Sequence, residues 1–316
     1  MIKRAKIVII GTGYIAHHHI KVFRQIKFFN LVGISSRKLS NAKKIAKKYK
    51  IKKFSSDYQK LIKDIKPDAI LILVSPQNIY QVTKNILKYK IPFLVEKPVG
   101  LSLNECNELS KLTKNTKVPN MVGLNRRFYS SFLQLHKIFK KEGYPKNIIV
   151  EGHEKIWWVK HKSKKVVKNW HYANNIHIID LINYFGGDIT EVETKLISNK
   201  SHNLNVSSII RLKNNSLAVY NSFWQSPDGW SIKLLAPHYS ILIKPLEKIS
   251  YINRKNEEKI FKMSNYDKKF KPGFYLQAKY FQKLIERGKN IWPSKNIYQV
   301  LQTYYLIKKI FKLNRW

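Results

Sequence analysis

Short apolar runs alternate with helical patterns along the first 120 residues of the chain. Apolar residues spaced three and four apart predict helices between these runs. The predicted strands are Ala5–Ile10, Phe29–Ser35, Ala69–Val74, Ile91–Val95 and Asn120–Leu124. The predicted helices are a stretch from the turn after Ile10 to about Lys27, then Asn41–Tyr49, Tyr80–Tyr89 and Leu103–Leu112. Nearly continuous apolar strands that alternate with helices predict a parallel sheet covered on both faces.

The pattern changes at about residue 123. Strand-like segments with alternating or β-branched residues follow one another with few helices between them, which predicts a mainly antiparallel sheet. These segments are Asn147–His153, Ile189–Ile197, Val206–Leu212, Ser216–Trp224 and Ser231–Leu235. Predicted helices are Ile176–Tyr184, which ends at Gly186-Gly187, and then Phe274–Arg287 and Ile297–Lys312. We therefore predict an α/β protein with two domains, residues 1–122 and 123–316.

Composition is compatible with two ordinary globular domains. The chain has 316 residues, of which 44% are hydrophobic, and a single cysteine, Cys106. One cysteine excludes an internal disulfide or a site with several thiolate ligands. No apolar run reaches the roughly 18 residues of a membrane helix, and Gly11 ends the first apolar run too early for a secretory signal. We expect a cytoplasmic protein without membrane partners.

The charge is unusual. Sixty Lys and Arg residues against nineteen Asp and Glu give a net charge of +41, spread along the whole chain. An anionic partner would explain it, such as a phosphorylated or carboxylated small molecule or a nucleic acid. Compositional drift with general solvation explains it equally simply, because Lys, Ile and Asn are all abundant. No nucleic-acid-binding motif accompanies the charge, so we expect no specific nucleic-acid partner.

A glycine-containing turn joins the first predicted strand to the first helix. Its residues are Gly11, Thr12, Gly13, Tyr14 and Ile15, followed by Ala16. A dinucleotide pyrophosphate needs a tight turn, close approach of the backbone and the free N–H groups of a helix start. This position between strand and helix therefore predicts nucleotide binding.

The end of the second strand bears on the choice of cofactor. An NAD site usually places Asp or Glu there to accept from the ribose 2′-hydroxyl. This chain has Ser35, Ser36 and Arg37 instead. Hydroxyls and a guanidinium can bind a 2′-phosphate, which a carboxylate would repel. We expect NADP, although NAD stays possible if Arg37 only stacks on the adenine.

Two further segments carry groups suited to acid–base chemistry. Lys97 lies between Glu96 and Pro98 directly after a predicted strand, where open α/β sheets bind ligands. His177 and Asp180 are three residues apart and share a helix face, so Asp180 could orient the helix or the imidazole. A lone histidine is also compatible with a buried structural role.

Together these motifs resemble the Gfo/Idh/MocA family, named for glucose–fructose oxidoreductase and inositol dehydrogenase. The resemblance also includes Ser75-Pro76 after the third strand and the segment Gly123–Phe128. It implies an N-terminal Rossmann domain and a C-terminal α/β domain with an open, mainly antiparallel sheet. It further implies a homodimer or homotetramer, commonly formed through the exposed face of that sheet. The Lys97–Pro98 bond is implied to be cis.

The resemblance implies an NAD(P)-dependent oxidoreductase that acts on the CH–OH or C=O group of a sugar or cyclitol. Lys97 and His177 are then the acid/base groups. The implied cofactor-binding residues are Gly11, Thr12, Gly13, Tyr14, Ile15, Ser35, Ser36, Arg37, Ser75, Pro76, Asn78, Glu96, Lys97 and Asn125. The implied substrate-binding residues are Lys97, Asn125, Trp157, Trp158, His171, Asn174 and His177. No metal site is expected.

Two departures from the family pattern bear on the activity. Ala173 stands where relatives with this histidine often carry Asp, and Tyr80 replaces a histidine. Alanine cannot polarise His177 or bind a hydroxyl, so a catalytically impaired nucleotide-binding sensor or scaffold is the alternative function. Asn174 and Asn175 are uncharged substitutes.

A loop rich in lysine and aromatic residues spans positions 155–165 and borders the substrate pocket in the family. Aromatic faces stack on sugar rings, and lysines favour a carboxylate or phosphate. The loop therefore predicts an acidic sugar or a nucleotide-sugar as substrate. Alternatively, Trp157 and Trp158 pack the domain junction while the lysines are solvated.

Overall fold

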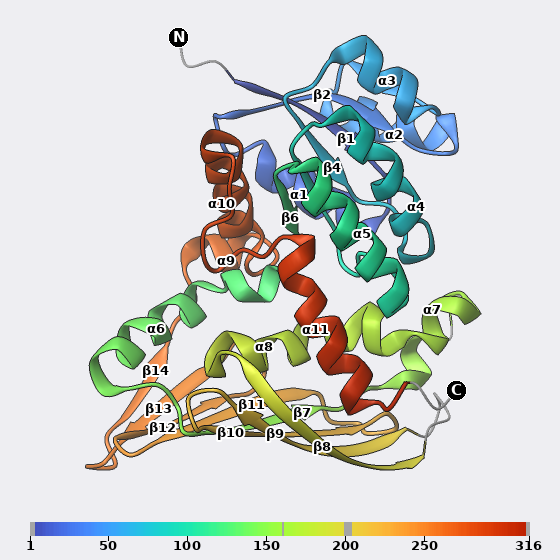
Figure 1. Cartoon of the computed structure of the whole chain (residues 1–316). Helices are drawn as coiled ribbons and strands as arrows, with labels where there is room; N and C mark the ends of the chain where they lie inside the picture. Colours follow the sequence, from blue (N-terminus) through green and yellow to red (C-terminus); the bar gives the residue numbers. More distant parts are fainter. Residues whose placement is uncertain (1–3, 160, 199–203, 314–316) are drawn as a thin grey trace. The chain divides into compact units, whose positions relative to one another are not determined.

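The computed structural model describes residues 4–159, 161–198 and 204–313 (Figure 1). The chain forms two compact units. Unit 1 comprises Met1–Asn125 and Tyr266–Leu301, and unit 2 comprises Arg126–Asn265 and Gln302–Trp316. A division at residues 122/123 assigns the segment Tyr266–Leu301 to the second domain, whereas the structure groups it with the first. No helix in the described ranges is long and apolar enough to cross a bilayer.

Unit 1 contains a six-stranded sheet in the order β3-β2-β1-β4-β5-β6, with every neighbouring pair parallel. The strands are β1 (Ala5–Ile10), β2 (Phe29–Ser35), β3 (Lys53–Ser55), β4 (Ala69–Ile72), β5 (Phe93–Val95) and β6 (Asn120–Val122). Ile7, Val8 and Ile9 are completely buried, as expected for a strand covered on both faces. The predicted α/β fold with a parallel sheet is confirmed. The strand order changes direction between β1 and β4, where folds of this kind bind ligands.

The helices of unit 1 connect successive strands, except for α10, which comes from the late segment of the chain. They are α1 (Tyr14–Phe23), α2 (Leu39–Tyr49), α3 (Tyr58–Ile65), α4 (Pro76–Ile86) with the short 3₁₀ helix η1 (Leu87–Tyr89), α5 (Leu103–Thr116) and α10 (Phe274–Arg287). The prediction that the first helix reaches Lys27 is wrong, since α1 ends at Phe23. The phenyl ring of Phe281 on α10 packs against Phe23 and Phe29, with centroids 6.1 and 6.3 Å apart. This aromatic contact holds the late segment of the chain against the early one within unit 1.

Each point at which the chain passes from one unit to the other falls inside a helical element. These elements are η2 (Asn125–Phe128), α9 (Asn265–Lys269) and α11 (Ile297–Ile310). Unit 2 itself contains the helices α6 (Ser130–Glu142), α7 (Lys164–Lys168) and α8 (Ile176–Gly186). It also contains the short 3₁₀ helix η3 (Ile156–Val159) and a π-helical turn, η4 (His171–Asn175).

Unit 2 is built on an eight-stranded sheet in the order β14-β13-β12-β11-β7-β10-β9-β8. The strands are β7 (Asn147–Gly152), β8 (Ile189–Ser198), β9 (Asn205–Leu212), β10 (Leu217–Phe223), β11 (Trp230–Ala236), β12 (Tyr239–Ile243), β13 (Ile249–Asn253) and β14 (Glu258–Phe261). β7 and β10 pair in parallel, and the other neighbouring pairs are antiparallel. The predicted mainly antiparallel sheet is therefore confirmed, with one parallel pair at its centre.

The two faces of this sheet have different surroundings. On the inner face, α8 lies over the strands, and a Cβ at Gly186 would be 2.5 Å from Leu212 and 2.8 Å from Ile148 (Figure 1). The strand register places alternate residues on the opposite, outer face. Exposed apolar residues of that face are Ile209, Leu217, Leu242, Ile252 and Ile260. The outer face therefore carries exposed apolar side chains among polar and charged ones, such as Arg211 and Lys233.

A buried ion pair holds α8 in place. The Arg127 Nη1 donates to Asp180 Oδ2 at 2.8 Å, and the two side chains are 4% and 1% exposed. The Thr303 hydroxyl donates to the other oxygen of Asp180 at 2.9 Å. Of the two roles considered for Asp180, these contacts support the orientation of the helix.

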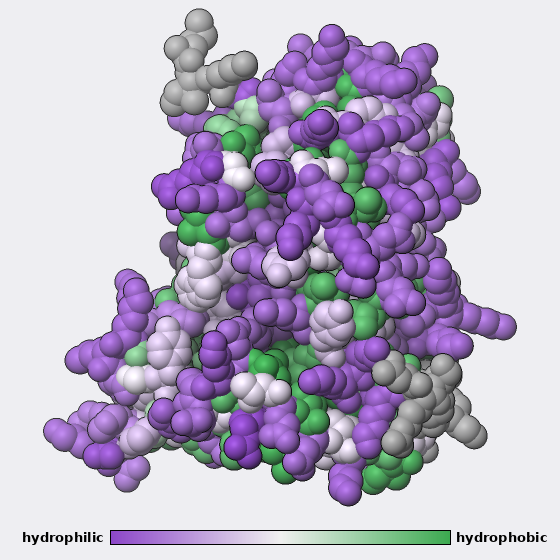
Figure 2. Space-filling view, viewed as in Figure 1, coloured by the Kyte–Doolittle hydropathy of each residue, from purple (hydrophilic) through white to green (hydrophobic). Residues whose placement is uncertain are grey.

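Much of the positive charge lies on solvated surfaces, for example along α2. Figure 2 shows hydrophilic residues over most of the visible face of the helices of unit 1. On α2, the exposed basic residues include Lys43, Lys44, Lys47 and Lys48, while Ala42, Ile45, Ala46 and Tyr49 form the buried face. The high charge is thus compatible with an ordinary packed core.

Candidate functional site

The turn between β1 and α1 lets a ligand approach the protein backbone closely. Gly11 has φ +117°, and a Cβ there would lie 2.4 Å from the Leu73 carbonyl oxygen, so no other residue fits. A Cβ at Gly13 would meet nothing within 4 Å, and the neighbouring Tyr14 is 73% exposed. No side chain caps the start of α1, so its N–H groups are available to an anion. These features fit a dinucleotide pyrophosphate.

The end of β2 lies beside this turn. The Thr12 hydroxyl donates to Ser36 Oγ at 2.9 Å, and the Gly11 N–H donates to the Ser35 carbonyl oxygen at 2.8 Å. Ser35 is buried, Ser36 is half-buried and Arg37 is exposed. The structure therefore brings together the residues predicted to bind the pyrophosphate and those predicted to bind the ribose. Hydroxyls and a guanidinium lie where an NAD site usually has a carboxylate.

The residues after β4 form the start of α4. Ser75 is the N-cap and Pro76 the first helical residue. The Asn78 side-chain amide donates to Ser75 Oγ at 2.7 Å, and its backbone N–H donates to the Ser75 carbonyl oxygen at 2.9 Å. Since β4 pairs with β1, this helix start lies on the ligand-binding edge of the sheet next to the glycine turn.

A buried histidine–glutamate pair lies directly behind Lys97. His19 Nε2 and Glu96 Oε1 are 2.7 Å apart and both residues are buried. The other Glu96 oxygen accepts the Lys97 backbone N–H at 3.2 Å. Gly123 is required here, because a Cβ at that position would lie 2.9 Å from Glu96 Oε1. Glu96 thereby fixes the backbone from which the Lys97 side chain extends.

Lys97 itself is half-buried at the carboxyl end of the sheet, and the Lys97–Pro98 peptide bond is cis, as the resemblance implies. Asn125, also in unit 1, is buried, and its amide donates to the Pro272 carbonyl oxygen at 2.9 Å. The ring of Phe274 lies 4.8 Å from that of His19. Sequence reasoning missed the contribution of the His19–Glu96 pair, although its glutamate was part of a recognised motif.

In unit 2, His177 is the second residue of α8, which starts directly after the π-helical turn His171–Asn175. The imidazole is 4% exposed, and its centroid lies 6.5 Å from the indole of Trp230. The Arg126 guanidinium stacks on the same indole at 4.8 Å. Since π-helical turns frequently mark functional sites, His177 occupies a position suited to ligand binding.

A buried carboxylate organises the surroundings of this histidine. Glu154 follows β7 and is 7% exposed. Its oxygens accept from Trp170 Nε1 at 2.9 Å, Asn174 Nδ2 at 2.9 and 3.1 Å, and Trp230 Nε1 at 3.2 Å. We call these four residues the Glu154 cluster. Sequence reasoning included Asn174 but missed the other three.

Other predicted substrate residues have different surroundings. His171 is buried against the rings of Tyr172, Trp224 and Phe311, and burial lowers its pKa to about 3. These are the surroundings of a core residue, so the structure gives no support to substrate binding by His171. Asn175, considered a substitute for the missing Asp, is fully buried and donates to the Gly152 carbonyl oxygen.

Trp157 and Trp158 lie in the short 3₁₀ helix η3 and are both exposed. The Lys155 ammonium lies 4.8 Å from the Trp158 ring centroid. Lys160 lies outside the described residues. Ala173 is buried, and Tyr80 donates its hydroxyl proton to Glu108 on α5. The two departures from the family pattern thus give an apolar position before His177 and a structural contact within unit 1.

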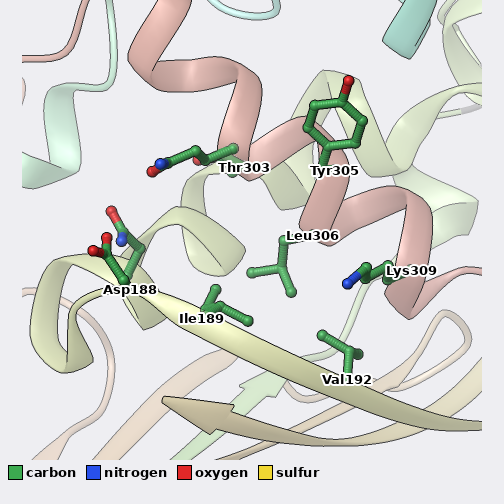
Figure 3. Close-up of a pocket in the computed structure, with 9 residues that line it drawn as sticks. Asp188, Ile189, Val192, Thr303, Tyr305, Leu306 and Lys309 are labelled. Carbon is green, nitrogen blue, oxygen red and sulfur yellow. The ribbon is translucent and has the colours of Figure 1, made fainter. Parts of the chain in front are cut away.

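A small cavity of about 180 Å³ also lies in unit 2, between β8 and α11 (Figure 3). Leu306, Ile189 and Val192 form its apolar wall, with Asp188 and Lys309 on opposite sides. None of the predicted site residues lines it. Within the described ranges, no group of three His, Cys, Asp or Glu side chains is arranged to hold a metal ion.

Comparison with known proteins agrees with this architecture. Residues 5–124 match the family model described as "Oxidoreductase family, NAD-binding Rossmann fold". Over these residues the chain is similar to the Gfo/Idh/MocA family. The match includes the glycine turn, the end of β2 and the Glu96–Pro98 segment. The resemblance drawn from the sequence motifs is confirmed.

Two curated proteins are similar to the first part of this chain. The uncharacterized oxidoreductase YrbE of Bacillus subtilis is 33% identical over 139 residues, which cover 44% of this chain and 40% of that protein. Myo-inositol 2-dehydrogenase of Thermotoga maritima is 28% identical over 130 residues, which cover 41% of this chain and 39% of that protein. The matches thus span about two fifths of the length of these relatives.

Solved structures extend the likeness to nearly the whole chain. An oxidoreductase from Agrobacterium radiobacter, crystallised in complex with NAD+, L-tartaric acid and magnesium, superimposes with a TM-score of 0.83. The comparison covers 98% of this chain and 96% of that one at 14% identity. At this identity the likeness shows a shared fold.

Proposed function

We propose that the chain is an NAD(P)-dependent oxidoreductase that transfers a hydride to or from a sugar-like substrate. The observation that carries this proposal is the position of Lys97. It extends from the ligand-binding edge of a Rossmann sheet, and its backbone is fixed by the buried Glu96 carboxylate. The bound nicotinamide would supply or accept the hydride. The match of residues 5–124 to an oxidoreductase family model supports the same conclusion.

The residues proposed to bind the cofactor lie along the carboxyl ends of the strands of unit 1. The glycine turn and the start of α1 would hold the pyrophosphate, and the Ser75–Asn78 turn with Glu96 and Asn125 would border the nicotinamide half. We propose NADP as the preferred cofactor. Ser36 and the exposed Arg37 would bind the 2′-phosphate, and no carboxylate at the end of β2 would repel it.

Lys97 and His177 are the proposed acid/base groups. In the reductive direction, the Lys97 Nζ would donate a hydrogen bond, and then a proton, to the oxygen that gains negative charge as the hydride arrives. In the oxidative direction it would accept that proton. His177 would orient a substrate hydroxyl or serve as a second proton acceptor.

We propose a polyhydroxylated substrate with an acidic or nucleotide-linked group. The exposed rings of Trp157 and Trp158 offer faces for a sugar ring, and the lysines around them favour an anion. Asn125 and Asn174 complete the proposed set as hydrogen-bonding groups. The myo-inositol 2-dehydrogenase relative supports a cyclic polyol, although its match covers only the first part of this chain.

We also propose that the protein is a homodimer or homotetramer. The outer face of the large sheet exposes apolar residues on successive strands. Exposed apolar side chains that gather on one face often mark a protein–protein contact. A second copy of the chain would bury them.

The alternative function is a nucleotide-binding sensor or scaffold of the same fold. It is favoured by Ala173, a buried residue of the π-helical turn four positions before His177, which provides no carboxylate. A protein of this kind would bind NADP(H) without turnover.

Kinetics of a Lys97→Ala variant test the proposal. Wild-type protein is assayed for NADH or NADPH formation or consumption with inositols, hexoses, uronates and nucleotide-sugars, and with both nicotinamide cofactors. Lys97→Ala should reduce kcat by about 100-fold or more, while the affinity for NADPH, measured by fluorescence, changes little. Lys111→Ala, which removes an exposed lysine of α5, is the matched control and should behave as wild type. Unchanged turnover in Lys97→Ala would refute this role, and cofactor binding without any turnover by wild type would favour the sensor.

A further inference from the structure

The Glu154 cluster commits three N–H groups to a single buried carboxylate. Trp170 and Trp230 reach it from α7's C-terminal side and from β11, and Asn174 reaches it from the π-helical turn. An indole N–H is only ever a donor, so both tryptophans must donate to Glu154. Their rings are therefore held in fixed orientations around the carboxylate.

The carboxylate also determines which way the Asn174 side chain points. An amide can normally be turned by 180° about its last bond, because its two ends are similar in shape. Here Nδ2 lies 2.9 and 3.1 Å from the two oxygens of Glu154. A carbonyl oxygen in that place would face an acceptor and gain no hydrogen bond. The NH2 end therefore faces the buried carboxylate, so Oδ1 is turned away from it in a residue that is half-buried.

The orientation of Asn174 matters because of its neighbour. Asn174 and His177 are three residues apart in consecutive helical turns, which places them on one face. The indole of Trp230, held by Glu154, lies 6.5 Å from the imidazole of His177. The cluster thus presents an acceptor oxygen and an aromatic face next to the proposed acid/base histidine.

We propose that Glu154 is a positioning residue that determines substrate specificity. It presents Asn174 Oδ1 as a hydrogen-bond acceptor. The substrate that is preferred therefore has a hydroxyl or N–H donor at that point. This inference rests on the proposed function and refines its substrate class. A carboxylate or phosphate of the substrate would meet another acceptor at Asn174 Oδ1, and its negative charge would lie close to that of Glu154. An acidic group of the substrate therefore binds elsewhere, and a neutral, donating part of the ring lies against Asn174.

Kinetics with deoxy analogues test the inference. Myo-inositol, D-glucose, D-glucuronate and UDP-D-glucose are the probes, each with its monodeoxy analogues. For whichever probe turns over, one deoxy position should lower kcat/KM of the wild type by about tenfold, mainly through KM. Asn174→Ala should remove that discrimination. Glu154→Gln, in which the amide can donate to a turned Asn174, should reduce it to below about threefold.

Glu151→Gln is the matched control. Glu151 lies on β7, three residues before Glu154, and its carboxylate accepts from Asn221 and pairs with His153. This variant should keep the full discrimination. If Glu154→Gln also keeps it, or if no deoxy position distinguishes wild type from Asn174→Ala, the inference is overturned.

A second readout separates this inference from the proposed function. The indole N–H resonances of Trp170 and Trp230 should move in a ¹H–¹⁵N spectrum of Glu154→Gln and stay in place in Glu151→Gln. Absence of turnover with every probe would overturn the proposed function, and these resonances then decide the role of Glu154. Unmoved resonances would show that its carboxylate does not hold the cluster.

Discussion

Replacement of Arg127 tests the structural importance of the buried ion pair that holds α8. The Arg127 and Asp180 side chains are 4% and 1% exposed, and their charged atoms are 2.8 Å apart. Arg127→Met leaves the Asp180 carboxylate buried with the Thr303 hydroxyl as a remaining donor. Removal of one partner of such a pair typically costs about 3–5 kcal/mol, because an uncompensated charge stays buried. The cation–π contact of Arg127 with Tyr184 is lost as well.

The corresponding change in melting temperature is large enough to measure. A cost of this size lowers the melting temperature of a unit of this length by roughly 6–20 °C. Thermal unfolding followed by tryptophan fluorescence reports mainly on unit 2, where Trp157, Trp158, Trp170, Trp224 and Trp230 lie. The double variant Arg127→Met/Asp180→Asn should recover part of the loss, since the stranded negative charge is gone.

An exposed ion pair provides the control. Lys84 and Glu108 are closer, at 2.6 Å, but their side chains are 43% and 45% exposed. Water screens such a pair, so Lys84→Met should leave the melting temperature unchanged within error. Because this pair lies in unit 1, both variants are also followed by far-ultraviolet circular dichroism, which reports on both units. Equal shifts for Arg127→Met and Lys84→Met would refute the reasoning, because they would show that burial does not determine the cost.

Three further predictions concern the nucleotide site and the core. Gly11→Ala should destabilise the protein by about 1–3 kcal/mol and abolish NADPH binding, because its Cβ would collide with the Leu73 carbonyl oxygen. Gly13→Ala should retain full stability in urea unfolding but lose NADPH affinity; equal stability losses would contradict the geometry of the turn. Arg37→Ala should weaken NADP+ binding by about 10–100-fold and leave NAD+ binding unchanged in calorimetric titrations, and a parallel loss of both would exclude a 2′-phosphate contact. His171 has a pKa of about 3 in the fold, below its ordinary value, so only the unfolded chain gains its proton as the pH falls from about 6.5, and stability decreases. His171→Gln should reduce the slope of unfolding free energy against pH between 6.5 and 4, and an unchanged slope would show that this imidazole is not desolvated.

Strands buried on both faces were the most predictable elements. The bounds of β1 and β2 agree with the apolar runs Ala5–Ile10 and Phe29–Ser35, because a covered parallel strand is a continuous apolar run. β12, β13 and β14 were missed. In β14, only Phe261 is buried, so the pattern carries almost no hydrophobic signal.

One missed helix did carry a signal. In α6, the buried residues Phe132, Leu135, His136 and Phe139 have the spacing of a helix face. The surrounding lysines and the expectation of strands after residue 123 hid the pattern. Its histidine counts as an apolar position here, since burial among aromatic rings lowers the pKa of His136 to about 4.

The candidate site likewise contains residues that the sequence pattern predicts and residues that it does not. The glycine turn and Lys97 were predictable because each follows a strand directly, and the end of a parallel strand is where ligands bind. Glu154 was not predictable in this way. Its partners Trp170, Asn174 and Trp230 are 16, 20 and 76 residues away, so only the fold brings them together. A solitary glutamate after a half-exposed strand looks like any surface residue.

Unit 1 is built from two separate segments of the chain, and this has a practical consequence. A fragment that stops near residue 125 lacks α10, and the side chains of Phe23 and Phe29 would lose the packing of Phe281. Such a truncated product would present bare aromatic rings to solvent and tend to aggregate. Recombination with a homologue at a single crossover would likewise join mismatched halves of one hydrophobic core. Chimeras that exchange the nucleotide-binding half must therefore carry both pieces from the same parent.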